Sequence, residues 1–182
     1  MSVLDPARGL GVAFSCLLAL RPAASAQTPS ASDTPDRAHV LGIARDVIKS
    51  ARYATLATLD DRQQPQARIV DPLDPDEAMT VYFATNPLSR KVAEIRRDPR
   101  VTLLYFDSAR PAYVTLIGRA RAVDAASKRV HFKQEWSGFF SPEKPDTYSL
   151  YRVEVSRIEV VSPKDGLPGN PATWRPEIVQ IR

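Results

Sequence analysis

The first regular pattern of apolar and polar positions predicts a helix that begins at Pro35. Apolar residues recur at helical spacing and would share one face: Val40, Ile43, Ala44, Val47 and Ile48. Asp33 or Thr34 precedes this segment and is suited to cap its N-terminus. We therefore expect an amphipathic helix with its apolar face packed on the rest of the domain.

Downstream of this helix, alternating apolar and polar residues predict a mostly β chain. Expected strands cover residues 53–59, 66–70, 79–84, 101–106, 112–123 and 147–161. Small residues at Gly118, Ala120 and Ala122 suit a tightly curved sheet. Several antiparallel strands and few helices, one of them expected over residues 125–136, favour a small barrel. The Pro-rich chain from residue 163 to 182 is expected to form an extended tail.

A short helix is expected between two of these strands, from Pro87 to the residue before Asp98-Pro99. Asn86 would cap the helix, because its side chain accepts a backbone N–H and proline suits the first helical position. Free N–H groups at a helix start, together with nearby cations and hydroxyls, form an anion site. The residues at this start are Ser89, Arg90 and Lys91. This segment is therefore our candidate for binding a phosphate.

Lys91 stands out within this segment. Leu88, Val92 and Ile95 form the predicted apolar stripe, and Lys91 lies on its flank rather than opposite it. A cation directed toward the buried side needs a partner there. The alternative is a lysine whose methylene stem packs on apolar surface while its ammonium reaches water.

The first 26 residues have the features of a secretory signal peptide. Arg8 precedes an apolar run over residues 9–20, and a small-x-small site ends at Ala26. The run is too short for a permanent membrane span, so we expect cleavage after Ala26 and a periplasmic protein. Cys16, the only cysteine, would leave with the peptide; lipidation of Cys16 is the alternative. Residues 27–36 read as a flexible tether, and the net charge of +4 does not require a nucleic-acid partner.

Three motifs together resemble the FMN-binding split barrel of the pyridoxamine 5'-phosphate oxidase-like superfamily, and most closely its general stress protein group. They are the Arg-x-Val strand at residues 67–70, the Thr-Asn-x-x-Ser-Arg-Lys turn at residues 85–91, and the strand over residues 113–118. The resemblance implies a six-stranded antiparallel split β-barrel with flanking helices over residues 37–162. It also implies a homodimer that holds FMN at its interface.

The same resemblance implies which residues contact the cofactor. Arg68, with Ile69 and Val70, would edge the flavin, and Tyr113 stands where oxidases of the family carry a glutamine. The phosphate would be held by Thr85, Ser89, Arg90 and Lys91. From the residues alone, Arg68 could instead pair with Asp60 or Asp71 on the surface. Arg90 could be solvent-exposed, and Tyr113 could simply pack.

The substrate side of the family pattern is missing. Leu73 stands in place of a substrate-binding lysine, Val161 replaces a ring-contacting tryptophan, and the C-terminal Arg-x-His motif is absent. Oxidation of vitamin B6 is therefore not expected. The leading hypothesis is an FMN-dependent oxidoreductase acting on an unknown small molecule, with catalytic residues unknown. The alternatives are a non-catalytic, stress-related flavin-binding protein, or a binder of deazaflavin or haem.

Other aromatic and histidine residues give weaker signals. Trp136, Phe139 and Phe140 could line a site at a subunit boundary, but a hydrophobic core or a dimer contact is the preferred interpretation. His131 has no second histidine or acidic residue at a spacing suited to metal ligation, so we expect no metal site.

Overall fold

The computed structural model describes residues 35–181 of the 182-residue chain. The expected signal peptide, residues 1–26, lies outside the described residues, and so does almost all of the expected tether over residues 27–36. Within the described part of the chain, no helix has the length and the apolar character needed to cross a membrane.

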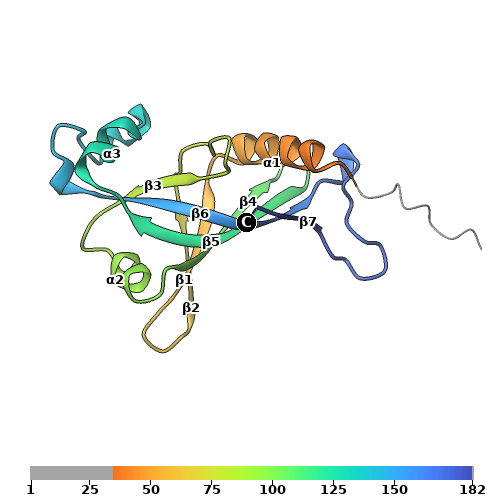
Figure 1. Cartoon of the computed structure of the whole chain (residues 1–182), viewed down its shortest axis with the longest axis horizontal. Coiled ribbons are helices and arrows are strands. Elements are labelled where there is room, and N and C mark those ends of the chain that lie inside the picture. Colours follow the sequence, from red (N-terminus) through yellow and green to blue (C-terminus); the bar gives the residue numbers. More distant parts are fainter. Residues whose placement is uncertain (1–34, 182) are drawn as a thin grey trace, which may run out of the picture. The chain divides into compact units, whose positions relative to one another are not determined.

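An antiparallel sheet forms the body of the domain (Figure 1). Six strands are hydrogen-bonded in the order β2-β1-β4-β5-β6-β3, and a seventh, β7, also pairs with β6. Their bounds are Ala54–Leu59 (β1), Pro65–Val70 (β2), Val81–Thr85 (β3), Arg100–Asp107 (β4), Ala112–Ala122 (β5), Ser149–Val161 (β6) and Glu177–Gln180 (β7). The sheet curls into a half-barrel, which confirms the predicted six-stranded antiparallel split barrel.

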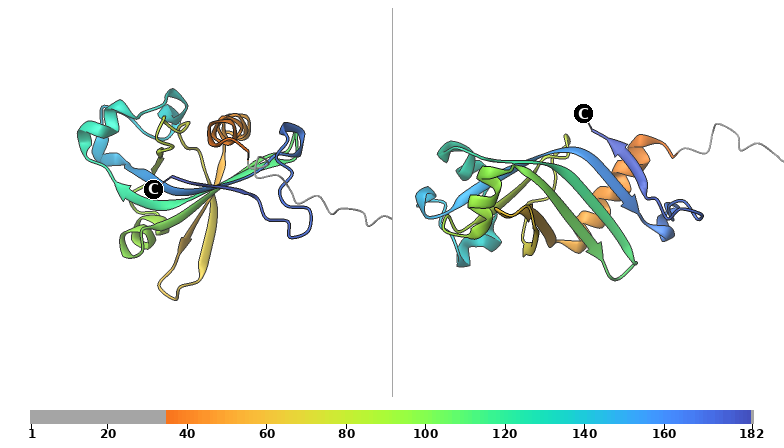
Figure 2. Two further views of the ribbon diagram at one scale, coloured as in Figure 1. Left: turned by 45° about the vertical axis from the view of Figure 1, so that its right-hand side comes forward. Right: turned by 90° about the horizontal axis from the view of Figure 1, so that it is seen from below.

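Helix α1 (Arg37–Ala51) packs on β4, β5 and β7 (Figure 2). Its five buried residues are those that the sequence pattern placed on one face: Val40, Ile43, Ala44, Val47 and Ile48. The helix begins at Arg37, with Asp36 in the N-cap position, so the expected start at Pro35 was two residues early. Burial of this apolar face supplies most of what holds the helix on the sheet.

A β-bulge between Ile117 and Gly118 bends the centre of the sheet. A Cβ atom at Gly118 would lie 2.2 Å from the backbone oxygen of Glu154 on β6, so only glycine allows the two strands to approach this closely. The expectation that small residues serve curvature in this strand is confirmed at this position.

The interior of the half-barrel is apolar and continuous with the buried face of α1. Inward-facing residues of neighbouring strands meet in register, for example Leu56 with Leu103 and Leu103 with Leu116. A second, smaller cluster is built around Trp136, Tyr148 and Leu150, with Phe140 packed against it. Packing is therefore the role of Trp136, as preferred from the sequence.

The helix expected over residues 125–136 is shorter than predicted. Helix α3 spans Ala125–Val130, and a separate 3₁₀ turn covers Gln134–Gly138. The chain leaves the helix at His131, whose ring stacks on Tyr82 at 3.8 Å, and Phe132 then packs edge-on against Trp136. These aromatic contacts favour a break that the sequence pattern did not reveal.

The expected extended tail over residues 163–182 needs a correction. Leu167 is buried and forms a β-bridge with Ser162, and Glu177–Gln180 form β7 against Arg157–Val160 of β6. Along β6, strand β3 pairs with Ser149–Val153, so the second half of β6 is free to take another strand on that side. The C-terminal residues thus belong to the sheet.

Candidate functional site

Helix α2 (Arg90–Arg97) follows β3 and precedes β4 in the chain, and its N-terminal end carries the candidate site (Figure 1). The expected helix start at Pro87 was wrong. Asn86 instead closes a turn, because its side-chain oxygen accepts the N–H of Leu88 at 2.8 Å and its backbone oxygen accepts the N–H of Ser89 at 3.0 Å. Ser89 occupies the N-cap position, so α2 begins at Arg90.

The predicted apolar stripe of this helix also changes. Ile95 is buried and Val92 packs against the core, but Leu88 is 94 % exposed because it lies in the turn before the helix. Glu94 takes a place on the buried side instead, at 5 % exposure. The inner face of α2 therefore includes a carboxylate.

Lys91 is the centre of a small polar cluster at the end of β3. Its Nζ donates to Thr85 Oγ1 at 3.0 Å and lies 3.3 Å from Ser89 Oγ, and the two hydroxyl oxygens are 3.2 Å apart. Thr85 is buried, and Ser89 and Lys91 are half-buried. The structure thus brings together three of the four predicted phosphate-binding side chains.

The charge of Lys91 is not balanced within this cluster. Among residues 35–181, no carboxylate lies within ion-pair distance of its ammonium, which has only neutral hydroxyl partners. Burial lowers the pKa of Lys91, the nearby positive charge of Arg68 lowers it further, and Glu94 offsets part of this effect. The cluster would therefore gain from an anion placed against the lysine.

Arg68 points from β2 toward α2 and joins a second polar group. Its Nη2 donates to Glu94 Oε2 at 2.8 Å, and its Nη1 donates to the hydroxyl of Thr58 and to the backbone oxygen of Gln66. The Thr58 hydroxyl in turn donates to Glu94 Oε2 at 2.6 Å. The alternative of a surface arginine paired with Asp60 or Asp71 is therefore wrong.

Thr58 and Glu94 were missed by the sequence reasoning. Glu94 follows Lys91 by three positions, a spacing that places both on one side of a helix, and it precedes the buried Ile95. Inward-facing and outward-facing residues alternate along β1, and this alternation places Thr58 on the same inner side as Leu56. These signals were present, but they indicate burial rather than the identity of a partner.

The remaining predicted site residues lie elsewhere. Arg90 is exposed at the first position of α2, Val70 is in the core, and Ile69 is 66 % exposed on the outer side of the sheet. Tyr113 on β5 is half-buried on the same outer side, between Phe106 of β4 and Val161 of β6 in the register. Ile69 and Tyr113 would meet a ligand only where it extends over the outer side.

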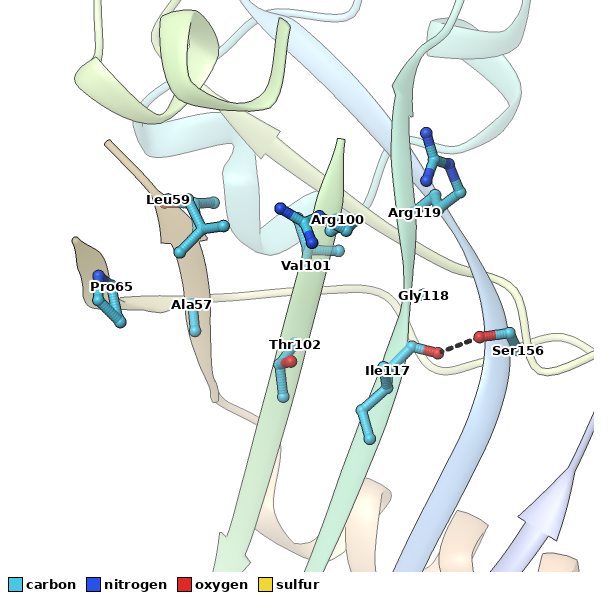
Figure 3. Close-up of a pocket in the computed structure, with 11 residues that line it drawn as sticks. Ala57, Leu59, Pro65, Arg100, Val101, Thr102, Ile117, Gly118, Arg119 and Ser156 are labelled. Atoms are coloured by element: carbon cyan, nitrogen blue, oxygen red, sulfur yellow. Dashed lines mark hydrogen bonds between the residues drawn. The ribbon is translucent and has the colours of Figure 1, made fainter. Parts of the chain in front are cut away.

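The outer side of the sheet is apolar and carries a groove of about 530 Å³ (Figure 3). Its floor is built from outward-facing residues of three neighbouring strands, among them Ala57, Thr102 and Ile117, and two arginines, Arg100 and Arg119, stand at one end. Exposed Leu104 and Phe106 continue the apolar surface along β4. Such a surface is typical of a contact with another protein or with a ring-shaped ligand.

No metal centre is present among residues 35–181, because no three His, Cys, Asp or Glu side chains converge there. His131 is engaged by Tyr82, and Phe139, at 84 % exposure, takes part in neither cluster of buried residues. The chemistry of the site therefore rests on cations, hydroxyls and one carboxylate.

Solved structures of similar fold give the first comparison. General stress protein 26 from Bacillus anthracis str. Sterne matches with a TM-score of 0.62 at 19 % identity, covering 78 % of this chain and 98 % of that one. A haem-binding protein from Mycobacterium smegmatis matches with a TM-score of 0.59 at 20 % identity, covering 81 % and 59 %. A pyridoxamine 5'-phosphate oxidase-related, FMN-binding protein from Nostoc punctiforme PCC 73102 matches with a TM-score of 0.50 at 17 % identity, covering 74 % and 84 %. At these identities the likeness is one of fold.

Sequence comparisons identify the family. A pyridoxine/pyridoxamine 5'-phosphate oxidase from Alcanivorax borkumensis is 31 % identical over 126 residues, which is 66 % of this chain and 59 % of that relative. The chain thus spans somewhat more than half the length of the relative. The model of the pyridoxamine 5'-phosphate oxidase family matches residues 43–162, from α1 to the end of β6. The chain therefore belongs to the pyridoxamine 5'-phosphate oxidase family.

Proposed function

We propose that this protein binds FMN and acts as an FMN-dependent oxidoreductase on a small molecule. One observation carries the proposal: Lys91 holds a half-buried ammonium against two hydroxyls, with no carboxylate partner among the described residues. A flavin phosphate would supply the missing negative charge and accept hydrogen bonds from all three side chains. The FMN-binding relative from Nostoc supports the choice of flavin.

Each residue of the site has a definite role in this proposal. Lys91, Thr85 and Ser89 hold the phosphate, and Arg90, in the first turn of α2, adds a second cation within reach. Arg68 brings a guanidinium to the inner side of the same end of the barrel. When bound, the isoalloxazine ring would supply the redox chemistry, and the protein would fix its orientation and exclude water.

We further propose that two copies of the chain pair through the outer side of the sheet. Leu104, Phe106 and Ile69 leave apolar surface exposed there, and Tyr113 lies beside it. Pairing would bury this surface and enclose a flavin ring that one chain alone leaves open. The phosphate end and the ring end of the cofactor would then be held by different parts of the assembly.

The proposal does not name the substrate, because two positions of the family's substrate side carry apolar residues here. Leu73 packs against the Trp136 cluster, and Val161 forms part of β6 opposite Tyr113, so neither position offers a charged group to a phosphorylated substrate. Oxidation of vitamin B6 is therefore not proposed. The haem-binding relative raises a second cofactor, but the Lys91 cluster offers a cation and hydroxyls, which suit a phosphate, whereas haem requires a well-placed axial ligand such as histidine.

The test compares FMN with riboflavin, which lacks the phosphate. Lys91→Ala should weaken FMN by about one to two decades, the value of a charge-assisted contact of about 1.5–3 kcal/mol, and leave riboflavin affinity unchanged. Titration of flavin fluorescence on the purified protein measures both constants. The absorbance spectrum of the purified protein, followed by reduction with nicotinamide donors, separates an enzyme from a passive binder.

Lys133→Ala is the matched control. Lys133 is also a half-buried lysine, but it pairs with Asp71 and with the backbone oxygen of Pro72. Its removal should not change the ratio of FMN to riboflavin affinity. Equal losses of FMN and riboflavin on Lys91→Ala would show that the lysine supports the fold instead of the phosphate.

A further inference from the structure

The Glu94 carboxylate forms an ion pair with Arg68 near the site where we propose that the phosphate binds. Oε2 of Glu94 accepts both the Nη2–H of Arg68, at 2.8 Å, and the hydroxyl of Thr58, at 2.6 Å. The ion pair is secluded, since the side chains are 7 % exposed for Glu94 and 19 % exposed for Arg68. Without a ligand, one cation of the site is thus already neutralised by the protein itself.

The Lys91 cluster and the Arg68–Glu94 pair at this end of the barrel interact electrostatically. Lys91 and Glu94 are one turn apart on α2, and the charges of Arg68 and Glu94 both act on the pKa of Lys91. Glu94 pairs with Arg68, and among residues 35–181 no carboxylate lies within ion-pair distance of Lys91, so the two cations have one paired carboxylate between them. A phosphate placed against Lys91 would be attracted by both cations and repelled by Glu94.

We infer that Glu94 sets the specificity of the site for phosphorylated over unphosphorylated flavin, by competing with the phosphate for Arg68. The inference rests on the proposed function, because it concerns the same phosphate site. A carboxylate and a phosphate both prefer the guanidinium edge, which has two N–H groups in one plane. With Glu94 in place, Arg68 must be shared or released, and the gain from the phosphate is smaller than the cations alone would give.

Replacement of Glu94 by glutamine separates this role from a structural one. The glutamine keeps the length of the side chain and an oxygen that accepts from Thr58, but it removes the negative charge. Nη1 of Arg68 keeps its bonds to Thr58 and to the backbone of Gln66, so the guanidinium stays near its place. Glu94→Gln should therefore bind FMN about tenfold more tightly than the wild type and bind riboflavin equally well.

The experiment measures FMN and riboflavin dissociation constants for the wild type, Glu94→Gln and Asp107→Asn. Asp107 is the matched control, a buried carboxylate paired with Arg110 at 2.8 Å in the β4–β5 hairpin. Asp107→Asn should leave the FMN-to-riboflavin ratio unchanged. A second readout needs no flavin: inorganic phosphate should raise the Tm of Glu94→Gln more than that of the wild type.

The outcomes are distinct. An unchanged ratio for Glu94→Gln would show that the ion pair only holds α2 on the sheet, and weaker FMN binding would show that Glu94 positions Arg68 for the phosphate; either result overturns the inference. If Glu94→Gln does not fold, Glu94→Asp withdraws the carboxylate by one methylene, and the same ratio should rise, though less. A wild type that binds FMN and riboflavin equally would contradict the proposed function, while the phosphate measurement would still decide the role of Glu94.

Discussion

The β4–β5 hairpin end of the domain and the α2 end both place an arginine beside a buried carboxylate, but they balance charge differently. At the hairpin end, Arg110 lies between Asp107, at 2.8 Å, and Asp165, at 3.4 Å. At the α2 end, Arg68 pairs with Glu94 at 2.8 Å, and Lys91 has no carboxylate partner among residues 35–181. One end has more negative than positive groups in contact, and the other has more positive groups.

The surrounding hydrogen bonds follow the same difference. Asp107 also accepts the backbone N–H of Ala109 at 3.0 Å, and Asp165 accepts the hydroxyl of Ser162, so the hairpin network is closed by the protein. Among residues 35–181, the Lys91 ammonium has no carboxylate partner and donates hydrogen bonds only to the hydroxyls of Thr85 and Ser89. Burial of a charged pair therefore does not distinguish a ligand site from a structural contact, whereas an unbalanced charge does.

The largest effect is expected at the β-bulge, where Gly118 pairs with Val101 near the start of β4. Gly118→Ala would place a Cβ atom 2.2 Å from the backbone oxygen of Glu154, so β5 and β6 must move apart. We expect a loss of about 3 kcal/mol in the free energy of unfolding, measured by urea denaturation followed by circular dichroism.

Gly42→Ala provides the control for this substitution. Gly42 lies within α1, and a Cβ atom there would meet nothing within 4 Å. Alanine should therefore stabilise the protein by about 0.5–1 kcal/mol. If Gly118→Ala were as stable as the wild type, the close approach of β5 to β6 at Gly118 would not be needed for the fold.

The next effect is expected at the hairpin end. A hydrogen bond from Ser50, with help from Arg110 and the backbone of Ala109, holds the pKa of Asp107 below its ordinary value of 3.8. A lowered folded-state pKa means that the stabilisation is complete above about pH 3.8 and is lost as the pH falls below it. Asp107→Asn should therefore lower Tm by several degrees near pH 7, and the difference from the wild type should shrink in acid.

The FMN-to-riboflavin affinity ratio of Asp107→Asn should stay at the wild-type value, because the hairpin contributes nothing to the phosphate. A change in that ratio would remove the distinction between the two ends. Calorimetric scans across the acid range, together with flavin titrations, measure both quantities.

The smallest effect is expected from the proton of Lys91. Its folded-state pKa is lowered, so between that value and the ordinary 10.5 the unfolded chain binds more protons, and stability rises with pH. The Tm of the flavin-free wild type should therefore rise, relative to Lys91→Met, as the pH increases through this window. Bound FMN should flatten the rise, because the phosphate favours the charged lysine. The same slope in both proteins would contradict an unbalanced charge at this end.

Local patterns predicted most of the fold. The buried face of α1 follows directly from 3.6-residue spacing, and β1 and β5 follow from alternation, because these signals depend only on which face meets the core. The start of α2 was wrong because an asparagine that caps a helix and one that closes a turn look the same in sequence. The strand at Glu177–Gln180 was missed because it depends on the part of β6 that β3 leaves unpaired.

The candidate site was predictable only in part for a similar reason. Thr85, Ser89 and Lys91 lie within seven residues of one another, and their clustering follows from one turn and the first turn of α2. The pairing of Arg68 with Glu94 joins residues 26 positions apart. It depends on how α2 lies over β1 and β2, and no local pattern states that arrangement.

Strand β7 also limits edge-to-edge association between copies of this chain. Long β6 runs beyond β3, and without Glu177–Gln180 the N–H and C=O groups of Arg157–Val160 would be open along that edge. An open edge of this kind is a template on which a strand of another molecule can add, and repeated addition leads to aggregates. Residues 177–180 thus cover this edge of the sheet, and we expect a chain that lacks them to self-associate more readily.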